Sequence, residues 1–180
     1  MEAAYEVASN LRPEDLEEVV EGHGLNPIIY IPLSCLHGDN VYFTVPDGRI
    51  AGLAGVQDHG QVWMLTTPAI HDFPITFARE AKRFIDARTE PRLWNIVYAK
   101  NIVHIKLLKH LGFKFGGEFP YGPFNRHFIE FQNVCPRSIR YCSGWCRTYG
   151  IRWFRTIRIS ISSRPECTNL CTEYAEQDQL

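Results

Sequence analysis

Two asparagines and a histidine in the middle of the chain carry side chains that could take part in chemistry: Asn95, Asn101 and His104. Asn101 and His104 are three residues apart, so they would lie close together at the start of a helix that begins near Asn101. An imidazole titrates near neutral pH, which suits His104 to act as a general acid. Structural interpretations remain open beside this one. Asn101 is a good helix cap, Asn95 can be an amide on a strand, and His104 can be a partly buried group bonded to the backbone.

The elements that would position these residues are predicted by the stretch from Gln61 to Phe115. An apolar, β-branched run at 61–67 predicts a strand that ends before a proline. Apolar residues at spacings of three and four predict a helix after Asp72, and a second apolar strand follows at 93–98. A helix that crosses between two such strands indicates parallel neighbours in one sheet. We therefore expect a pocket where the strand at Leu65, Thr66 and Thr67 separates from the strand that carries Asn95.

The rest of the first 133 residues completes an α/β domain with the predicted order βααβββαβαββ, a central mixed sheet and helices on both of its faces. The pattern predicts a strand at 5–8, helices beginning at 12 and 26, strands at 41–45 and 49–57, and a last strand at 126–131. A break in the chain is expected at Gly116-Gly117, after the strand that ends at Phe115. Gly112 is expected to end the helix that begins at Asn101, because a left-handed residue is favoured there.

Composition bounds the class of protein. A chain of 180 residues with 45% hydrophobic content is long enough for one globular domain and an appendage. The net charge of −1 gives no general attraction to nucleic acid or to anionic membranes. No apolar run reaches membrane-spanning length and the first residues do not resemble a secretory signal, which predicts a cytosolic protein where it is made. No Walker loop, GxSxG, HExxH or calcium-loop motif occurs, and no metal site is predicted.

The composition changes near Val134. Residues 1–133 carry 12 Lys and Arg against 16 Asp and Glu, whereas residues 134–180 carry seven Arg, no Lys and four acidic residues, with five of the six cysteines. We predict a boundary there between the domain and a basic, Cys-rich tail. Several hypotheses for the tail stay open: a zinc site at the paired cysteines 142/146 and 167/171, nucleic-acid contact by its arginines and aromatic residues, and an edge strand within 151–162. A further hypothesis is that a frameshift replaced a native ending.

The order of elements, the opening Arg12-Pro13, and the segment from Asn101 to Gly112-Phe113 resemble the GNAT acetyltransferase superfamily over residues 3–133. Within that superfamily, Trp94-Asn95-x-Val97 and the segment that begins at Asn101 resemble a small GNAT-like protein encoded by short-tailed phages beside their internal virion (ejection) proteins. The superfamily resemblance implies an acyl-coenzyme A N-acyltransferase. The backbone of Leu65, Thr66 and Thr67 would then bind the thioester, with Asn95 and Asn101 nearby.

Two departures from that pattern argue against the standard activity. Active members have a glycine-rich turn after the strand that ends near residue 67, which binds the coenzyme pyrophosphate at a helix N-terminus. Here that turn contains no glycine, two prolines remove possible N–H donors, and Asp72 adds a negative charge. The tyrosine that members use to protonate the leaving thiolate is replaced by Leu108, which leaves His104 as the substitute acid.

The favoured prediction is therefore a phage virion-associated or assembly protein on a degenerate GNAT-like scaffold. Such a protein would act through contacts with other phage structural or internal core proteins and would need no cofactor. It would be made in the host cytoplasm, with a place in the virion as the extension of that hypothesis. The alternative is an acyltransferase that uses acetyl-CoA. A DNA-binding module based on the basic tail is a third hypothesis.

Overall fold

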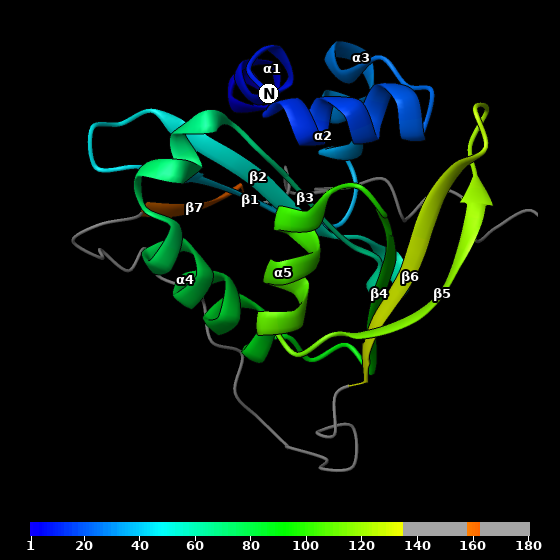
Figure 1. Ribbon diagram of the computed structural model, residues 1–180. Helices are drawn as coiled ribbons and strands as arrows, with labels where there is room; N and C mark the ends of the chain where they lie inside the picture. The colour runs from blue at the N-terminus through cyan, green and yellow to red at the C-terminus, as the bar shows by residue number, and fades with distance from the viewer. Residues whose placement is uncertain (135–157, 163–180) are drawn as a thin grey trace, which may run out of the picture.

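A computed structural model describes residues 1–134 and 158–162 (Figure 1). The α-helices are α1 (Glu2–Ser9), α2 (Pro13–Glu17), α3 (Pro27–Ser34), α4 (Pro74–Asp86) and α5 (Ile102–His110). A π-helix, η1 (Glu18–Gly22), continues α2, and two 3-10 turns are η2 (Asp58–Gly60) and η3 (Pro68–Asp72). The strands are β1 (Asp39–Thr44), β2 (Ile50–Val56), β3 (Val62–Thr66), β4 (Arg92–Tyr98), β5 (Lys114–Tyr121), β6 (Arg126–Val134) and β7 (Arg158–Ser162).

The strands form two antiparallel sheets, in the orders β3-β2-β1-β7 and β4-β6-β5. A single parallel bridge between Gln61 and Trp94 joins them, so β3 and β4 have the predicted parallel direction but separate immediately beyond that point. Figure 1 shows α1, α2 and α3 on one face of the β1–β3 sheet and α4 and α5 on the other, as predicted. Residues 158–162 add an edge strand antiparallel to β1.

The predicted first strand at Tyr5–Ala8 is wrong, because these residues belong to α1. Ala4, Val7 and Ala8 are buried and recur at helical spacing, and they share a core cluster with Ile31 of α3. The repeat of three and four residues was present in the sequence, but a short alternating apolar pattern resembles a strand when the preceding residues are not considered. The structure thus replaces the expected opening strand with a helix.

The second correction concerns Gly116-Gly117, which do not break the chain. The strand β5 runs through both glycines, and the register of its pairing with β6 shifts between Phe115 and Glu118. Glycines inside a strand commonly mark such a bulge. The strand is therefore longer than predicted and continues into the hairpin that leads to β6.

The helix that carries His104 begins and ends as predicted. Asn101 accepts a hydrogen bond from the backbone N–H of His104 at 3.2 Å, and Gly112 has φ of +89° just after α5. Buried residues Ile105, Leu108 and Leu111 attach α5 to a core cluster that includes β4 and β6. No helix in the described part of the chain is long and apolar enough to cross a membrane.

Gly60 lies very close to the backbone of Arg92, the first residue of β4, and substitution of this glycine tests how close the two segments are. It has φ of +80°, and a Cβ atom there would lie 1.9 Å from the carbonyl oxygen of Arg92. Gly48 has φ of +93° with open space around it. We expect Gly48→Ala to cost about 1–2 kcal/mol, the usual penalty for a left-handed L-residue. Gly60→Ala should cost roughly 1–3 kcal/mol more, because the backbone of Arg92 must move. Urea unfolding of both variants measures this difference, and equal losses would contradict the close approach.

Candidate functional site

A buried ion pair joins the first helices to the end of β3. Asp15 is 1% exposed and accepts hydrogen bonds from Arg12 Nη2 at 2.7 Å and Arg12 Nε at 3.1 Å. It also accepts from the backbone N–H of Thr66 at 2.9 Å, from Thr66 Oγ1 at 2.7 Å, and from Asn101 Nδ2 at 3.1 Å. Both carboxylate oxygens are therefore fully occupied. Burial opposes ionisation of Asp15, but the hydrogen bonds and charge of Arg12 outweigh it, so the pKa of Asp15 is lowered.

Glu18 lies one turn further along the same helix and has the opposite electrostatic behaviour. It is 8% exposed and accepts a hydrogen bond from Asn101 Nδ2 at 2.9 Å. Burial raises the pKa of Glu18 to about 7, and the negative charge of Asp15 adds to the increase. A carboxyl group that titrates near neutral pH can exchange a proton with a ligand under physiological conditions. Glu18 is therefore the strongest acid–base candidate among the described residues.

His104 lies beside these two carboxyl groups. Its side chain is surrounded by protein but keeps some exposed area because it faces a cavity. Burial lowers the pKa of His104, so the imidazole is neutral at pH 7, although the charge of Asp15 partly opposes that shift. A neutral imidazole is better suited to accept a proton or to donate a hydrogen bond than to act as a strong acid. The use of His104 as the acid in acyl transfer stays a prediction.

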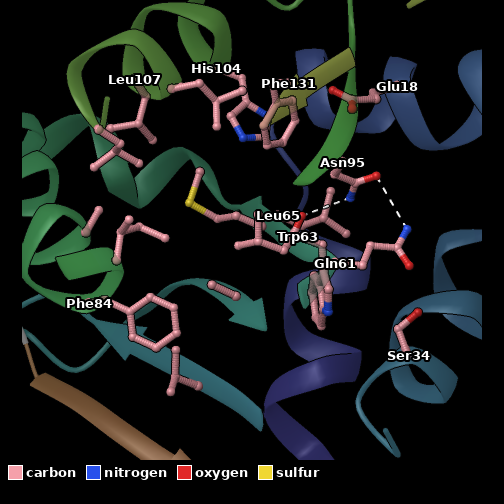
Figure 2. A pocket seen from close by; sticks show the side chains of 18 of the residues that line it. Glu18, Ser34, Gln61, Trp63, Leu65, Phe84, Asn95, His104, Leu107 and Phe131 are labelled. Atoms are coloured by element: carbon pink, nitrogen blue, oxygen red, sulfur yellow. Dashed lines mark hydrogen bonds between the residues drawn. The ribbon is translucent and has the colours of Figure 1, made fainter. Parts of the chain in front are cut away.

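A cavity of about 160 Å³ runs through the gap between β3 and β4 and contacts helices of both layers (Figure 2). Phe84 of α4 and Leu107 of α5 line it on one side of the sheet, and Ser34 of α3 lines it on the other. Glu18 and His104 contribute polar groups to its wall. The predicted pocket between the separating strands is present, and its mainly apolar lining with few polar groups is typical of a small-ligand site.

Asn95 holds the two strands together where the cavity begins. Its Nδ2 donates to the carbonyl oxygen of Val62 at 2.9 Å, and its Oδ1 accepts from the backbone N–H of Ile96 at 2.8 Å. Gln61 Nε2 also donates to Asn95 Oδ1, at 3.4 Å, as the dashed lines in Figure 2 show. The amide therefore replaces part of the sheet ladder that is lost as β3 and β4 separate. This arrangement matches the structural interpretation of Asn95, and it leaves Asn95 on the cavity wall.

Of the residues expected to bind a thioester, some line the cavity and others have backbone groups that are already hydrogen-bonded. The side chain of Leu65 lines the cavity. The backbone groups of Thr66 are occupied, since its N–H donates to Asp15 and its carbonyl oxygen accepts from the N–H of Arg12 at 2.9 Å. The N–H of Thr67 donates to the carbonyl oxygen of Ala51 at 3.0 Å. Of the predicted cofactor-binding residues, the structure brings Leu65 and Asn95 to the cavity, whereas Thr66 and Asn101 belong to the Asp15 network.

The loop between β3 and α4 is folded into η3 and is filled by its own side chains. Ala69 and Ile70 are buried in a core cluster, with 8% and 6% of their surfaces exposed. Asp72 accepts a hydrogen bond from Arg49 Nη2 at 2.7 Å, so its charge is paired at the surface. An open loop with free N–H groups, which would bind a pyrophosphate, does not form here. The residues of η3 do not fit the diphosphate of coenzyme A in the manner expected from the superfamily.

Asp15, Glu18 and His104 also bring possible metal ligands within 4.8 Å of one another. Both oxygens of Asp15 already accept hydrogen bonds, and the guanidinium of Arg12 beside it would repel a cation. These three side chains therefore suit a buried hydrogen-bond network better than a metal site. The paired tail cysteines of the zinc hypothesis lie outside the described residues, as do the arginine and aromatic residues between 137 and 157.

The sequence alone does not single out Glu18, because Glu14, Asp15, Glu17, Glu18 and Glu21 together indicate an acidic, solvated helix face. The spacing of the residues could have distinguished Glu18 from the exposed acidic residues. Asp15 and Glu18 are three residues apart, and the apolar Val19 and the small Gly22 continue the same buried side of the helical segment. Acidic residues on a buried helix face need polar partners from elsewhere in the fold. The identity of those partners, Arg12 and Asn101, could not be read from local spacing.

Comparisons with known proteins identify the fold. No protein-family model matches the chain, and no curated protein sequence matches it. A GNAT-family acetyltransferase from Bacillus anthracis matches with a TM-score of 0.54 at 10% identity, over 74% of this chain and 87% of that chain. The chain therefore has the α/β fold of the GNAT acetyltransferases.

Two further neighbours are weaker matches. The protein yncA from Salmonella typhimurium, solved with acetyl-CoA, has a TM-score of 0.47 at 16% identity, over 73% of this chain and 88% of that chain. Spermidine N-acetyltransferase from Vibrio cholerae, in complex with CoA and spermine, has a TM-score of 0.39 at 12% identity, over 49% of this chain and 60% of that chain. The match covers less than two thirds of the length of the Vibrio cholerae enzyme.

Proposed function

We propose that the protein is an N-acyltransferase whose cavity between β3 and β4 binds the acyl group, with Glu18 as general base. The observation that carries this proposal is a buried carboxyl group with a pKa of about 7 on the wall of a cavity that opens between separated strands. The fold is that of acetyltransferases, which supports the reaction class. Acetyl-CoA, when bound, would supply the acyl group as an activated thioester.

The residues around the cavity have separate tasks in this proposal. Because burial raises the pKa of Glu18 to about 7, its carboxylate can accept the proton that an acceptor amine loses as it becomes a nucleophile. Phe84 and Leu107 exclude water from the acyl group. Asn95 keeps the cavity open because it bridges β3 and β4 through Val62. Leu108 is buried in the core and has no proton to donate, so the alternative acid remains His104.

The filled loop leads to a specific expectation about donor binding. Because η3 provides no diphosphate site, we expect acetyl-CoA and S-acetylpantetheine, which lacks the nucleotide, to bind with dissociation constants within about threefold of each other. Isothermal titration calorimetry with both compounds measures this ratio. An affinity for acetyl-CoA more than about 100-fold higher than for S-acetylpantetheine would contradict our description of the loop. The absence of submillimolar binding by either compound would contradict the acyltransferase proposal itself.

A second function is favoured by one observation: Ala69 and Ile70 fill the position where active enzymes hold the diphosphate. On that basis, and on the sequence resemblance of the segment around Trp94, we also propose a phage virion-associated or assembly protein. It would be made in the host cytoplasm, would contact internal core proteins, and could be carried into the virion. The comparisons give this second proposal no support. Mass spectrometry of purified virions from a phage that encodes this chain tests it, since its absence from particles and from assembly intermediates would refute it.

A further inference from the structure

The cavity between β3 and β4 has an apolar end and a polar end. Figure 2 shows Phe84 of α4 and Leu107 of α5 on one side of the cavity. Glu18 and Gln61 lie on the opposite side. The apolar end also includes five lining residues that belong to the same hydrophobic cluster as Leu107: Phe43, Ala54, Met64, Phe77 and Ala81. A ligand with a hydrocarbon part and a polar group at one end would match this division.

The wall of the cavity offers no positive charge. Among the described residues that line it, none is a lysine or an arginine. Burial lowers the pKa of both lining histidines, His23 and His104, so their imidazoles are neutral at pH 7. The lining carboxyl groups are those of Glu18 and Glu80, and Glu80 accepts a hydrogen bond from Arg83 Nη1 at 2.7 Å. A ligand with a carboxylate of its own would therefore lose its water without gaining a counter-charge.

The volume of the cavity is larger than an acetyl group requires. The cavity has a volume of about 160 Å³, and an apolar cavity of about 150 Å³ accommodates benzene, which has six carbon atoms. An acetyl group has three non-hydrogen atoms and would fill only about half of such a space. Unfilled apolar space is unfavourable, because the side chains around it lose dispersion contacts. The cavity is therefore better matched in size to a longer acyl group.

From the size, polarity and charge of this cavity we infer that it binds an uncharged acyl group of about six carbon atoms in preference to acetyl. The inference rests on the acyltransferase function proposed above and specifies its donor. The hydrocarbon chain would lie among Ala81, Phe84 and Leu107, with the carbonyl carbon toward Glu18. There the acceptor nitrogen forms a bond to the carbonyl carbon as the carbon–sulfur bond breaks, and Glu18 takes the amine proton. Glu18 then returns its proton to solvent, and the released thiolate takes up a proton from solvent.

Isothermal titration calorimetry of the full chain with S-acylpantetheines that differ only in the acyl group tests both chain length and charge. Each buried methylene strengthens binding about fourfold, so S-hexanoylpantetheine should bind at least roughly 20-fold tighter than S-acetylpantetheine. S-decanoylpantetheine should bind no tighter than the hexanoyl compound, because its last carbon atoms exceed the cavity. S-glutarylpantetheine, which has a similar length and a terminal carboxylate, should bind at least roughly 10-fold more weakly than the hexanoyl compound.

Two substitutions at the apolar end change the volume of the cavity in opposite directions. Ala81→Leu adds three carbon atoms and should weaken hexanoyl binding at least roughly 10-fold, while acetyl binding changes less than about threefold. Phe84→Ala enlarges the same end, so the decanoyl compound should then bind at least about fivefold tighter than the hexanoyl compound. Ala87→Leu, at an exposed position just after α4 that does not line the cavity, is the matched control. It should leave all four affinities unchanged.

The outcomes distinguish this inference from the proposed function. Equal affinities for the acetyl and hexanoyl compounds, or an affinity that keeps rising to decanoyl in the wild type, would overturn the chain-length preference and leave the acyltransferase proposal intact. Tight hexanoyl binding without transfer to an amine would support the preference and count against the catalytic proposal. The absence of submillimolar binding by every compound would refute both. Circular dichroism melting curves verify that each variant is folded, and if Ala81→Leu does not fold, the reversal expected in Phe84→Ala still decides the matter.

Discussion

Glu18→Gln is expected to lower the acyl-transfer rate by about 10²–10⁴ while making the folded protein more stable at pH 8. The loss of rate follows from removal of the general base, whose pKa near 7 suits proton transfer at neutral pH. The gain in stability follows because the amide of Gln can still accept from Asn101 Nδ2 but never has to be buried as a charge. Opposite effects on activity and stability are typical of a residue that is strained for function.

The pH dependence of this stability change has a definite sign. The pKa of Glu18 is about 7 in the folded protein and 4.5 as a free side chain, so the folded state binds the proton more tightly. Its contribution is fully present below about pH 4.5 and is lost as the pH rises through 7. The free energy of unfolding of Glu18→Gln should exceed that of the wild type by up to about 3 kcal/mol above pH 7, and this excess should vanish near pH 4.5.

The contribution of His104 to the free energy of unfolding changes with pH in the opposite direction to that of Glu18. Its pKa is lowered in the folded state, so its contribution is present above the ordinary value of 6.5 and is lost as the pH falls. His104 is present in both the wild type and Glu18→Gln, so its contribution largely cancels when the two proteins are compared at the same pH. Glu14→Gln, on the preceding turn and outside the buried network, is the control and should change neither rate nor stability. An unchanged rate in Glu18→Gln would refute its catalytic role, and a loss of stability at pH 8 would refute its raised pKa.

The largest loss of stability is expected for Asp15→Asn. The substitution leaves the guanidinium of Arg12 buried without its counter-charge, and breaking a buried ion pair in this way costs about 3–5 kcal/mol. An asparagine also cannot accept all five hydrogen bonds that reach Asp15, because one of its two positions is a donor. Such a loss is a large fraction of the total stability of a small domain. Urea unfolding monitored by circular dichroism measures it.

Two further variants make this prediction decisive. Asp86→Asn removes a 57% exposed partner of Lys82 on α4 and should cost less than about 1 kcal/mol. If Asp15→Asn does not fold, Arg12→Met/Asp15→Leu keeps the test valid, since removal of both charges should give a more stable protein than removal of Asp15 alone. The effect of Asp15→Asn should also diminish as the pH falls below 3.8, because the lowered pKa of Asp15 contributes stability above that value. Equal effects of Asp15→Asn and Asp86→Asn would contradict the buried network.

The local signals of the sequence determined most of the second half of the domain. The helix that begins at Asn101, the glycine that ends it, and the strands on either side of α4 follow from apolar periodicity and from capping chemistry. These features depend on residues within one or two turns of each other. The gap between β3 and β4 was predicted because parallel strands with a helical connection diverge at their ends. The GNAT fold that the sequence resemblance predicts agrees with the structural comparison.

The candidate site was decided by tertiary structure. Asp15 meets Thr66 and Asn101, which are 51 and 86 positions away in the chain, and Glu18 meets the same asparagine. A carboxyl group has an ordinary pKa on a solvated helix and a raised pKa when folding removes its water, so the sequence could not separate Glu18 from its acidic neighbours. The closure of η3 around Ala69 and Ile70 likewise depends on the core that receives them. Spacing along the chain determines which face of an element is apolar, but desolvation and long-range hydrogen bonds arise only when the elements pack, and they determine which of its polar groups can do chemistry.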